Sequence, residues 1–228
     1  MNLSLIPCRR VIVGLIAAVA LAALTFGSLA TAPGAGAMPA RAMGGTAVTP
    51  KGLAFHDAMR ALWQAHGTWT ERAIVDFVGE LPDAELAVER LLANQTEIGD
   101  AVKPYYGAKG GAELTKLLKA HIDDAVAVLA AAKSGNEAAT AKAESAFYAN
   151  GDEVAAFLHS ANPMNWPLKE MRTMMRTHLN QVIGLAVDQL TGRYGAAIKL
   201  YDAYIAHLLD MADMLSEGIM RQFPGRFG

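Results

Sequence analysis

The sequence predicts an all-α protein, an up-and-down helical bundle of three consecutive helical hairpins with six helices, preceded by an export signal. Three observations support this prediction. From residue 51 onward apolar residues recur at spacings of three and four, which is the period of one helix face. No segment alternates apolar and polar residues as a half-buried strand does. Similar short segments also return at intervals of 55 to 57 residues, which indicates an internal repeat.

The N-terminal residues have the order of a secretory signal. Arg9 and Arg10 precede an uncharged apolar run over 11–26, and small residues follow it. The cleavage site is either Ala35-Gly36-Ala37 or Ser28-Leu29-Ala30. The run is short for a membrane span, so we expect an exported protein, periplasmic or secreted, with an uncleaved anchor as the alternative. The predicted organisation is a signal peptide at 1–37, a flexible leader at 38–50 and a helical bundle domain at 51–228.

Composition excludes several classes of function. The only cysteine, Cys8, lies inside the predicted signal, so residues 38–228 have no disulfide and no thiolate ligand. Without the two arginines of the signal, 18 basic residues stand against 22 acidic ones, a net charge of −4. This balance gives no electrostatic reason to expect nucleic acid as a partner, and no membrane contact is expected after signal cleavage.

Turn-forming residues divide the remaining chain into six predicted helices. The breaks fall at Leu81-Pro82-Asp83, at 103–111, at Ser134-Gly135-Asn136, at 161–167 and at Gly192. Asp83 and Asn136 are the expected N-terminal caps of the helices that follow them. The predicted helices are 52–79, 83–102, 112–133, 137–160, 168–190 and 194–222.

Two sets of polar residues repeat in step along the chain. His66, His121 and His178 occupy equivalent places on the first helix of each predicted hairpin (53–102, 112–160 and 168–218). Asn94, Asn150 and His207 occupy equivalent places on the second helices. An acid follows each of these three residues after three positions: Glu97, Glu153 and Asp210. Each His and its second-helix partner are equidistant from their turn, so the six residues are predicted to form one layer across the bundle, about 20 Å from the turns.

This polar layer has two interpretations. Buried imidazole and amide groups are costly unless they are hydrogen-bonded, so the layer can serve only to fix helix register. Alternatively it binds a metal, because imidazole and carboxylate groups on facing helices build metal centres in helical bundles. The candidate ligands are His66, His121, His178, His207, Glu97, Glu153 and Asp210, which suit Zn, Fe, Mn or Cu; Asn94 and Asn150 complete the layer.

Methionines and aromatic residues suggest two further features. Met171, Met174, Met175 and His178 share a helix face, as do His207, Met211 and Met214, and thioether with imidazole suits copper. Methionine at helical spacing also serves as core filling. The aromatic segments 103–107 and 162–167 connect the predicted hairpins, where they either rim a pocket or pack over the end of the bundle.

Three segments, Leu62 to Trp69, Asn150 to Leu158 and Met211 to Pro224, resemble a largely uncharacterised family of exported bacterial helical proteins. The resemblance spans Leu53 to Phe223. Some members carry the names acetylglutamate kinase or glycosyltransferase. An amino-acid kinase has an α/β fold with glycine-rich nucleotide loops, and this sequence has neither, so the resemblance implies an exported helical bundle and no catalytic residues.

The predicted function is that of an exported binding protein that holds a divalent metal or a small polar ligand in the layer. The alternative is a structural or partner-interaction module whose polar layer only fixes helix register. A metalloenzyme is the third hypothesis, and it requires Glu97 or Glu153 as a general base beside an open coordination position.

Overall fold

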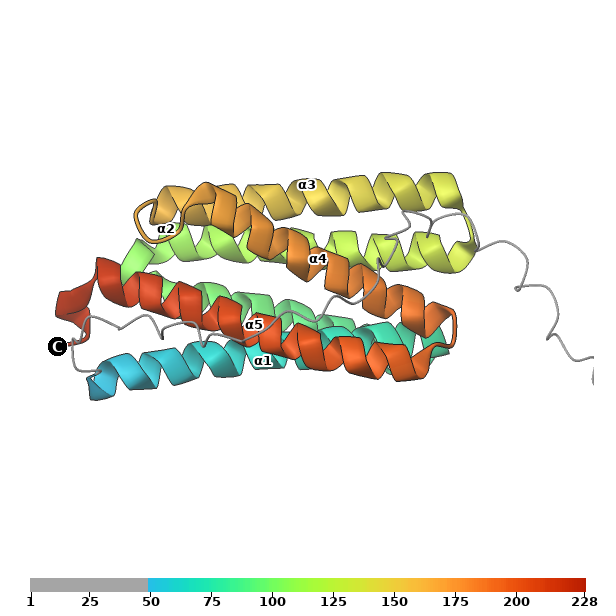
Figure 1. Ribbon diagram of the computed structural model, residues 1–228, viewed down its shortest axis with the longest axis horizontal. Helices are drawn as coiled ribbons and strands as arrows, with labels where there is room; N and C mark the ends of the chain where they lie inside the picture. Colours follow the sequence, from blue (N-terminus) through green and yellow to red (C-terminus); the bar gives the residue numbers. More distant parts are fainter. Residues whose placement is uncertain (1–48) are drawn as a thin grey trace, which may run out of the picture. The chain divides into compact units, whose positions relative to one another are not determined.

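The computed structural model describes residues 49–228, in which the only regular secondary structure is helical and no strand occurs (Figure 1). This confirms the all-α prediction. The predicted signal peptide and nearly all of the leader lie outside the described residues. The elements are α1 (Pro50–Gly79), α2 (Ala84–Ser134), α3 (Glu137–Ala161), α4 (Leu168–Leu190), α5 (Tyr194–Gln222) and the short 3-10 helix η1 (Pro224–Arg226).

Side-chain caps explain where two of the helices begin. The Thr49 hydroxyl accepts a hydrogen bond from the Gly52 amide at 3.0 Å, and Pro50 supplies a fixed φ at the first position of α1. Asn136 caps α3 by accepting from the Ala139 amide at 3.0 Å, as predicted. The cap predicted at Asp83 does not form, because the Asp83 carboxylate pairs with Arg72 at the adjoining end of α1.

Helix α2 covers two of the six predicted helices, so the described residues contain five α-helices. Its backbone leaves the helical conformation only at Gly107, where φ is 73° and ψ is 172°. A Cβ atom on Gly99 would lie 2.7 Å from the Gly111 carbonyl oxygen, although twelve residues of straight helix span about 18 Å. The chain therefore turns back on itself at Gly107, inside the predicted break at 103–111.

The helices pack in a closed order around one core. Each helix contacts the next one in sequence, and α5 returns to pack on α1, while α4 also touches α1 and α2. Figure 1 shows α3 beside the second part of α2, with α1 and α5 on the other side of the bundle. Among residues 49–228 no helix has the length and apolarity needed to cross a membrane.

Aromatic residues close the end of the bundle at which α1 begins and the chain terminates. Phe55, Tyr105 and Phe227 form mutual ring contacts with centroids 5.0 to 5.3 Å apart. Trp166 is only 1% exposed and its indole nitrogen donates to the Met214 carbonyl at 3.3 Å. The Tyr106 hydroxyl donates to the Gln222 side chain at 2.7 Å. The predicted aromatic segments thus pack over the bundle end.

Candidate functional site

Three buried histidines meet in the middle of the bundle. His66 on α1, His121 on α2 and His178 on α4 are 3%, 3% and 2% exposed. The His178 ring lies between the other two, with centroid distances of 5.6 Å to each. Tyr204 of α5 stacks on His178 at 5.4 Å, so four helices are joined by an array of aromatic rings. The predicted burial of His121 and His178 is confirmed, whereas His207 is only partly buried.

One hydrogen bond recurs three times between a first and a second helix. We call His66, His121 and His178 the layer histidines. In each case the acceptor is the backbone carbonyl four positions before the layer histidine, and the donor–acceptor distance is 3.1 Å. The three bonds run from Asn94 Nδ2 to Leu62 O, from Asn150 Nδ2 to Leu117 O, and from His207 Nε2 to Met174 O. Residues predicted to be equivalent therefore make equivalent contacts.

A second bond, to Nδ1 of the layer histidine, is made in only two of the three places. Gln95 Nε2 donates to His66 Nδ1 at 3.1 Å. His121 Nδ1 donates to Asn150 Oδ1 at 2.8 Å, because the Asn150 amide nitrogen is already used toward Leu117. Both pairs are 29 residues apart in sequence. His178 and His207 have the same separation, yet His178 Nδ1 is buried without a hydrogen-bond partner.

The bond to the carbonyl and the bond to the imidazole are therefore made by different residues in the three places. Near His66 two amides make them, since Asn94 bonds the carbonyl and Gln95 bonds the imidazole. Near His121 the single amide of Asn150 makes both bonds. An imidazole at position 207 bonds the Met174 carbonyl through Nε2 but leaves the Nδ1 of His178 unpaired.

Burial keeps the layer histidines uncharged. Desolvation, with a smaller effect of nearby His121, lowers the pKa of His66 to about 3. Desolvation lowers the pKa of His121 to about 4, against the opposite effect of its bond to Asn150. The pKa of His178 is well below its usual value, first through burial and then through repulsion from His121, His66 and His207. All three rings are therefore neutral at neutral pH.

The predicted acidic ligands do not join the layer. Glu97, Glu153 and Asp210 are all exposed, and Glu97 pairs with Arg90 at 3.2 Å. Each residue advances about 100° around a helix, so an acid three positions after the layer residue lies about 60° behind it. The buried positions one, four, five and eight later lie about 40° to 140° ahead of it. These four positions form the buried arc of the second helices. The acids lie on the other side of Asn94, Asn150 and His207 from this arc.

The predicted ligands as a whole are not gathered into one centre. Within residues 49–228, no group of three or more His, Cys, Asp and Glu side chains is placed to hold a metal ion. The histidines converge, and the acids point into solvent.

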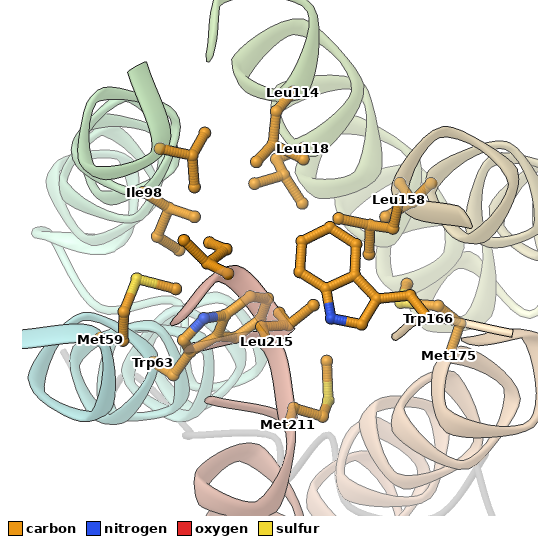
Figure 2. Close-up of a pocket in the computed structure, with 13 residues that line it drawn as sticks. Met59, Trp63, Ile98, Leu114, Leu118, Leu158, Trp166, Met175, Met211 and Leu215 are labelled. Carbon is orange, nitrogen blue, oxygen red and sulfur yellow. The ribbon is translucent and has the colours of Figure 1, made fainter. Parts of the chain in front are cut away.

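The methionines predicted as copper ligands belong to the core. Met171, Met174, Met175 and Met211 are buried, and Met214 is partly buried. Figure 2 shows Met59, Met175 and Met211 on different sides of an apolar cavity that Trp166 also lines, so their side chains surround the space and do not form a cluster.

Two small cavities lie in the apolar core. The cavity in Figure 2 has a volume of about 20 Å³ and is lined by apolar side chains of all five α-helices. The second, of about 40 Å³, is lined by residues nearer the turns, including Phe77, Ile122 and Val182. A single water needs roughly 10–15 Å³ of this kind of volume. The interior therefore has room for molecules of about the size of water.

Sequence reasoning missed Gln95. The matching of Asn94 with Asn150 set the alignment, and Gln95 lies one position later. The constant separation of 29 residues between each layer histidine and its partner was the signal that identifies it.

Comparison of the chain with known protein families, with curated proteins and with solved structures found no match.

Proposed function

We propose that this chain is an exported structural or partner-interaction module, built from three helical hairpins whose polar layer fixes the register of the helices. The observation that carries the proposal is the hydrogen bond that recurs at 3.1 Å from Asn94, Asn150 and His207 to a carbonyl of the preceding helix. A helix that slid by one turn would lose this bond and leave a buried amide or imidazole unpaired.

Burial of the second helices supports the three-hairpin organisation. Positions three residues before and one, four, five and eight residues after the layer residue are buried in all three cases. The equivalent sets are Leu91, Phe147 and Tyr204; Gln95, Gly151 and Leu208; Ile98, Val154 and Met211; Gly99, Ala155 and Ala212; and Val102, Leu158 and Leu215. The reversal at Gly107 supplies the connection between the first hairpin and the second.

The other predicted functions have less support. A binding protein for an organic ligand needs a larger space than pockets of about 20, 40 and 60 Å³. The proposed metalloenzyme needs Glu97 or Glu153 beside the histidines, and both carboxylates are exposed. The three recurring bonds to backbone carbonyls are made within the chain, and they need no ligand.

A double-mutant cycle tests the register role. His121 and Asn150 are replaced singly and together by Leu, and unfolding free energies are measured with urea. Because each single change leaves a buried polar atom unpaired, we expect a coupling energy of about 1 kcal/mol or more, with the double variant recovering part of the loss. Additive losses would show that His121 and Asn150 are not coupled and would contradict the proposal that the layer fixes helix register.

Export and a partner role are tested on the chain made in its native host. We expect the protein in an exported fraction, with its N-terminus between residues 31 and 50. A partner role predicts a defined hetero-complex, measured by size-exclusion chromatography with light scattering, that dissociates when exposed residues of one face are changed while the layer stays intact. A protein found only in the cytoplasm contradicts the export part of the proposal.

A further inference from the structure

Helix α5 exposes two large apolar side chains on one face. Tyr194 and Ile198 are 61% and 64% exposed and lie one helical turn apart. Tyr201 and Ile205, both partly buried, continue this face at spacings of three and four residues. Among residues 49–228, no other helix carries two exposed large apolar side chains. We call Tyr194, Ile198, Tyr201 and Ile205 the apolar row.

The same face of α5 is covered by the chain farther along the helix. Ala212 and Ser216 follow Tyr194 and Ile198 by about five complete turns, so they point in the same directions. Both Ala212 and Ser216 are 0% exposed. This face thus has small side chains where the rest of the chain covers it and large apolar side chains where it is open.

A hollow of about 60 Å³ lies beside the apolar row. It is lined from α1 by Glu71 and Val75, from α4 by Leu185, and from α5 by Ile198 and Tyr201. Exposed apolar surface that is contiguous, and not scattered as single residues, marks protein interaction sites. The hollow adds a place where a side chain of a partner can insert.

The apolar row is symmetric about the point between Lys199 and Leu200. If two α5 helices pair antiparallel about a two-fold axis at this point, the first residue of the row faces the last residue of the other row, and the second faces the third. Spacings of four, three and four residues are those of the seam between two paired helices. The row is therefore complementary to a second copy of itself.

The charges beside the row fit the same arrangement. Lys199 and Asp202 are exposed, and both lie on the same side of the row. In the antiparallel pair, Lys199 of each copy is on the same side as Asp202 of the other, displaced by roughly 3 Å along the helix axis. A parallel pair would place the two Lys199 side chains beside each other, and like charges repel. Charge therefore favours an antiparallel second copy.

We propose that a second copy of this chain binds to the apolar row, with the two α5 helices antiparallel about a two-fold axis between Lys199 and Leu200. The inference rests on the partner-interaction part of the proposed function and names its surface and its partner. A stable interface buries about 800 Å² on each partner, and the row is short, so we expect a weak dimer with a dissociation constant on the order of 10–100 µM.

Sedimentation velocity of the purified protein at about 5–500 µM brackets this dissociation constant. Ile198→Glu places a carboxylate in the middle of the row and should weaken association at least about tenfold. Leu86→Glu is the matched control, because Leu86 is 63% exposed but lies on α2, outside the row. It should leave association unchanged, and circular dichroism checks that both variants are folded.

Charge reversal tests the antiparallel arrangement. Lys199→Glu and Asp202→Lys should each weaken the dimer, and the double variant should restore it, because opposite charges face each other again. The proposal is overturned if the chain is monomeric at every concentration, if Leu86→Glu weakens association as much as Ile198→Glu, or if the double variant does not recover.

One outcome separates this proposal from the proposed function. A chain that stays monomeric but binds a different protein through Ile198 overturns self-association and supports the partner role. The double-mutant cycle at His121 and Asn150 tests the register role separately, because neither residue belongs to the apolar row.

Discussion

Two single substitutions, His207→Asn and Asn150→His, test how the three proposed hairpins pair their layer histidines. Asn150 is 29 residues after His121 and 33 after Leu117, and His207 has the same separations from His178 and Met174. An asparagine at 207 is therefore expected to donate to the Met174 carbonyl and to accept from His178 Nδ1. His207→Asn should then be a stabilising substitution.

The magnitude follows from two opposing terms. An unsatisfied buried donor or acceptor costs about 1–3 kcal/mol, and this cost is removed. The partly exposed imidazole of His207 is lost, and an apolar area on the order of 40 Å² at about 25 cal/mol per Å² is worth about 1 kcal/mol. We expect a net gain of about 1 kcal/mol, or a rise of about 2–4 °C in the melting temperature for a domain of this size.

The reverse exchange, Asn150→His, should leave His121 Nδ1 unpaired and destabilise the protein by about 1–3 kcal/mol. Thermal melts followed by circular dichroism, with a chelator present, measure both. The exposed Asp210→Asn serves as a control and should change stability by less than about 0.5 kcal/mol. Because most substitutions destabilise, the sign for His207→Asn is the decisive result, and a lower melting temperature would refute the assigned pairing.

Three further predictions concern other parts of the chain. His66 and His121 have folded-state pKa values of about 3 and about 4, below the unfolded value, so their neutral burial stabilises the fold fully above pH 6.5 and this contribution is lost as pH falls. At pH 5 the two histidines together should lower the free energy of unfolding by about 4 kcal/mol relative to pH 7.5. Urea unfolding at the two pH values measures this difference, and equal stabilities would contradict the prediction. Gly218→Ala should destabilise by about 1–3 kcal/mol, because the added Cβ collides with the Trp166 indole, and tryptophan fluorescence during unfolding reports the change. Gly107→Ala should cost about 1–3 kcal/mol through its backbone conformation alone, since no atom lies within 4 Å of the added Cβ; an unchanged urea midpoint refutes this.

The helical fold could be predicted because it follows from spacing along the chain. Positions on one face of a helix recur every three or four residues, and this placed His121 and His178 inside the core. A break in the helix was expected within 103–111, but three glycines lie there, and only the backbone shows that Gly107 makes the turn.

The acids were misplaced because spacing alone does not give the centre of the buried arc. Glu97 is three positions after Asn94 and so is adjacent to it on the helix surface, but on the side away from the core. Whether such a residue faces inward depends on how the neighbouring helices are arranged, which the spacing within one helix does not contain. The same limit explains why Gln95, on the other side of Asn94, was missed.

The imidazole at position 207 leaves its partner His178 without a hydrogen bond at Nδ1, which Gln95 and Asn150 supply to His66 and His121. The amides of Gln95 and Asn150 show that this fold can pair a layer histidine, and the third hairpin offers the same sequence separation for such a pair. A position where local rules are broken while the means to satisfy them exist elsewhere in the chain is where a functional requirement is expected. The sign of the stability change in His207→Asn therefore decides between two interpretations. A gain shows that position 207 keeps an imidazole at a cost in stability, and a loss shows that the imidazole contributes to packing and that the layer has only its structural role.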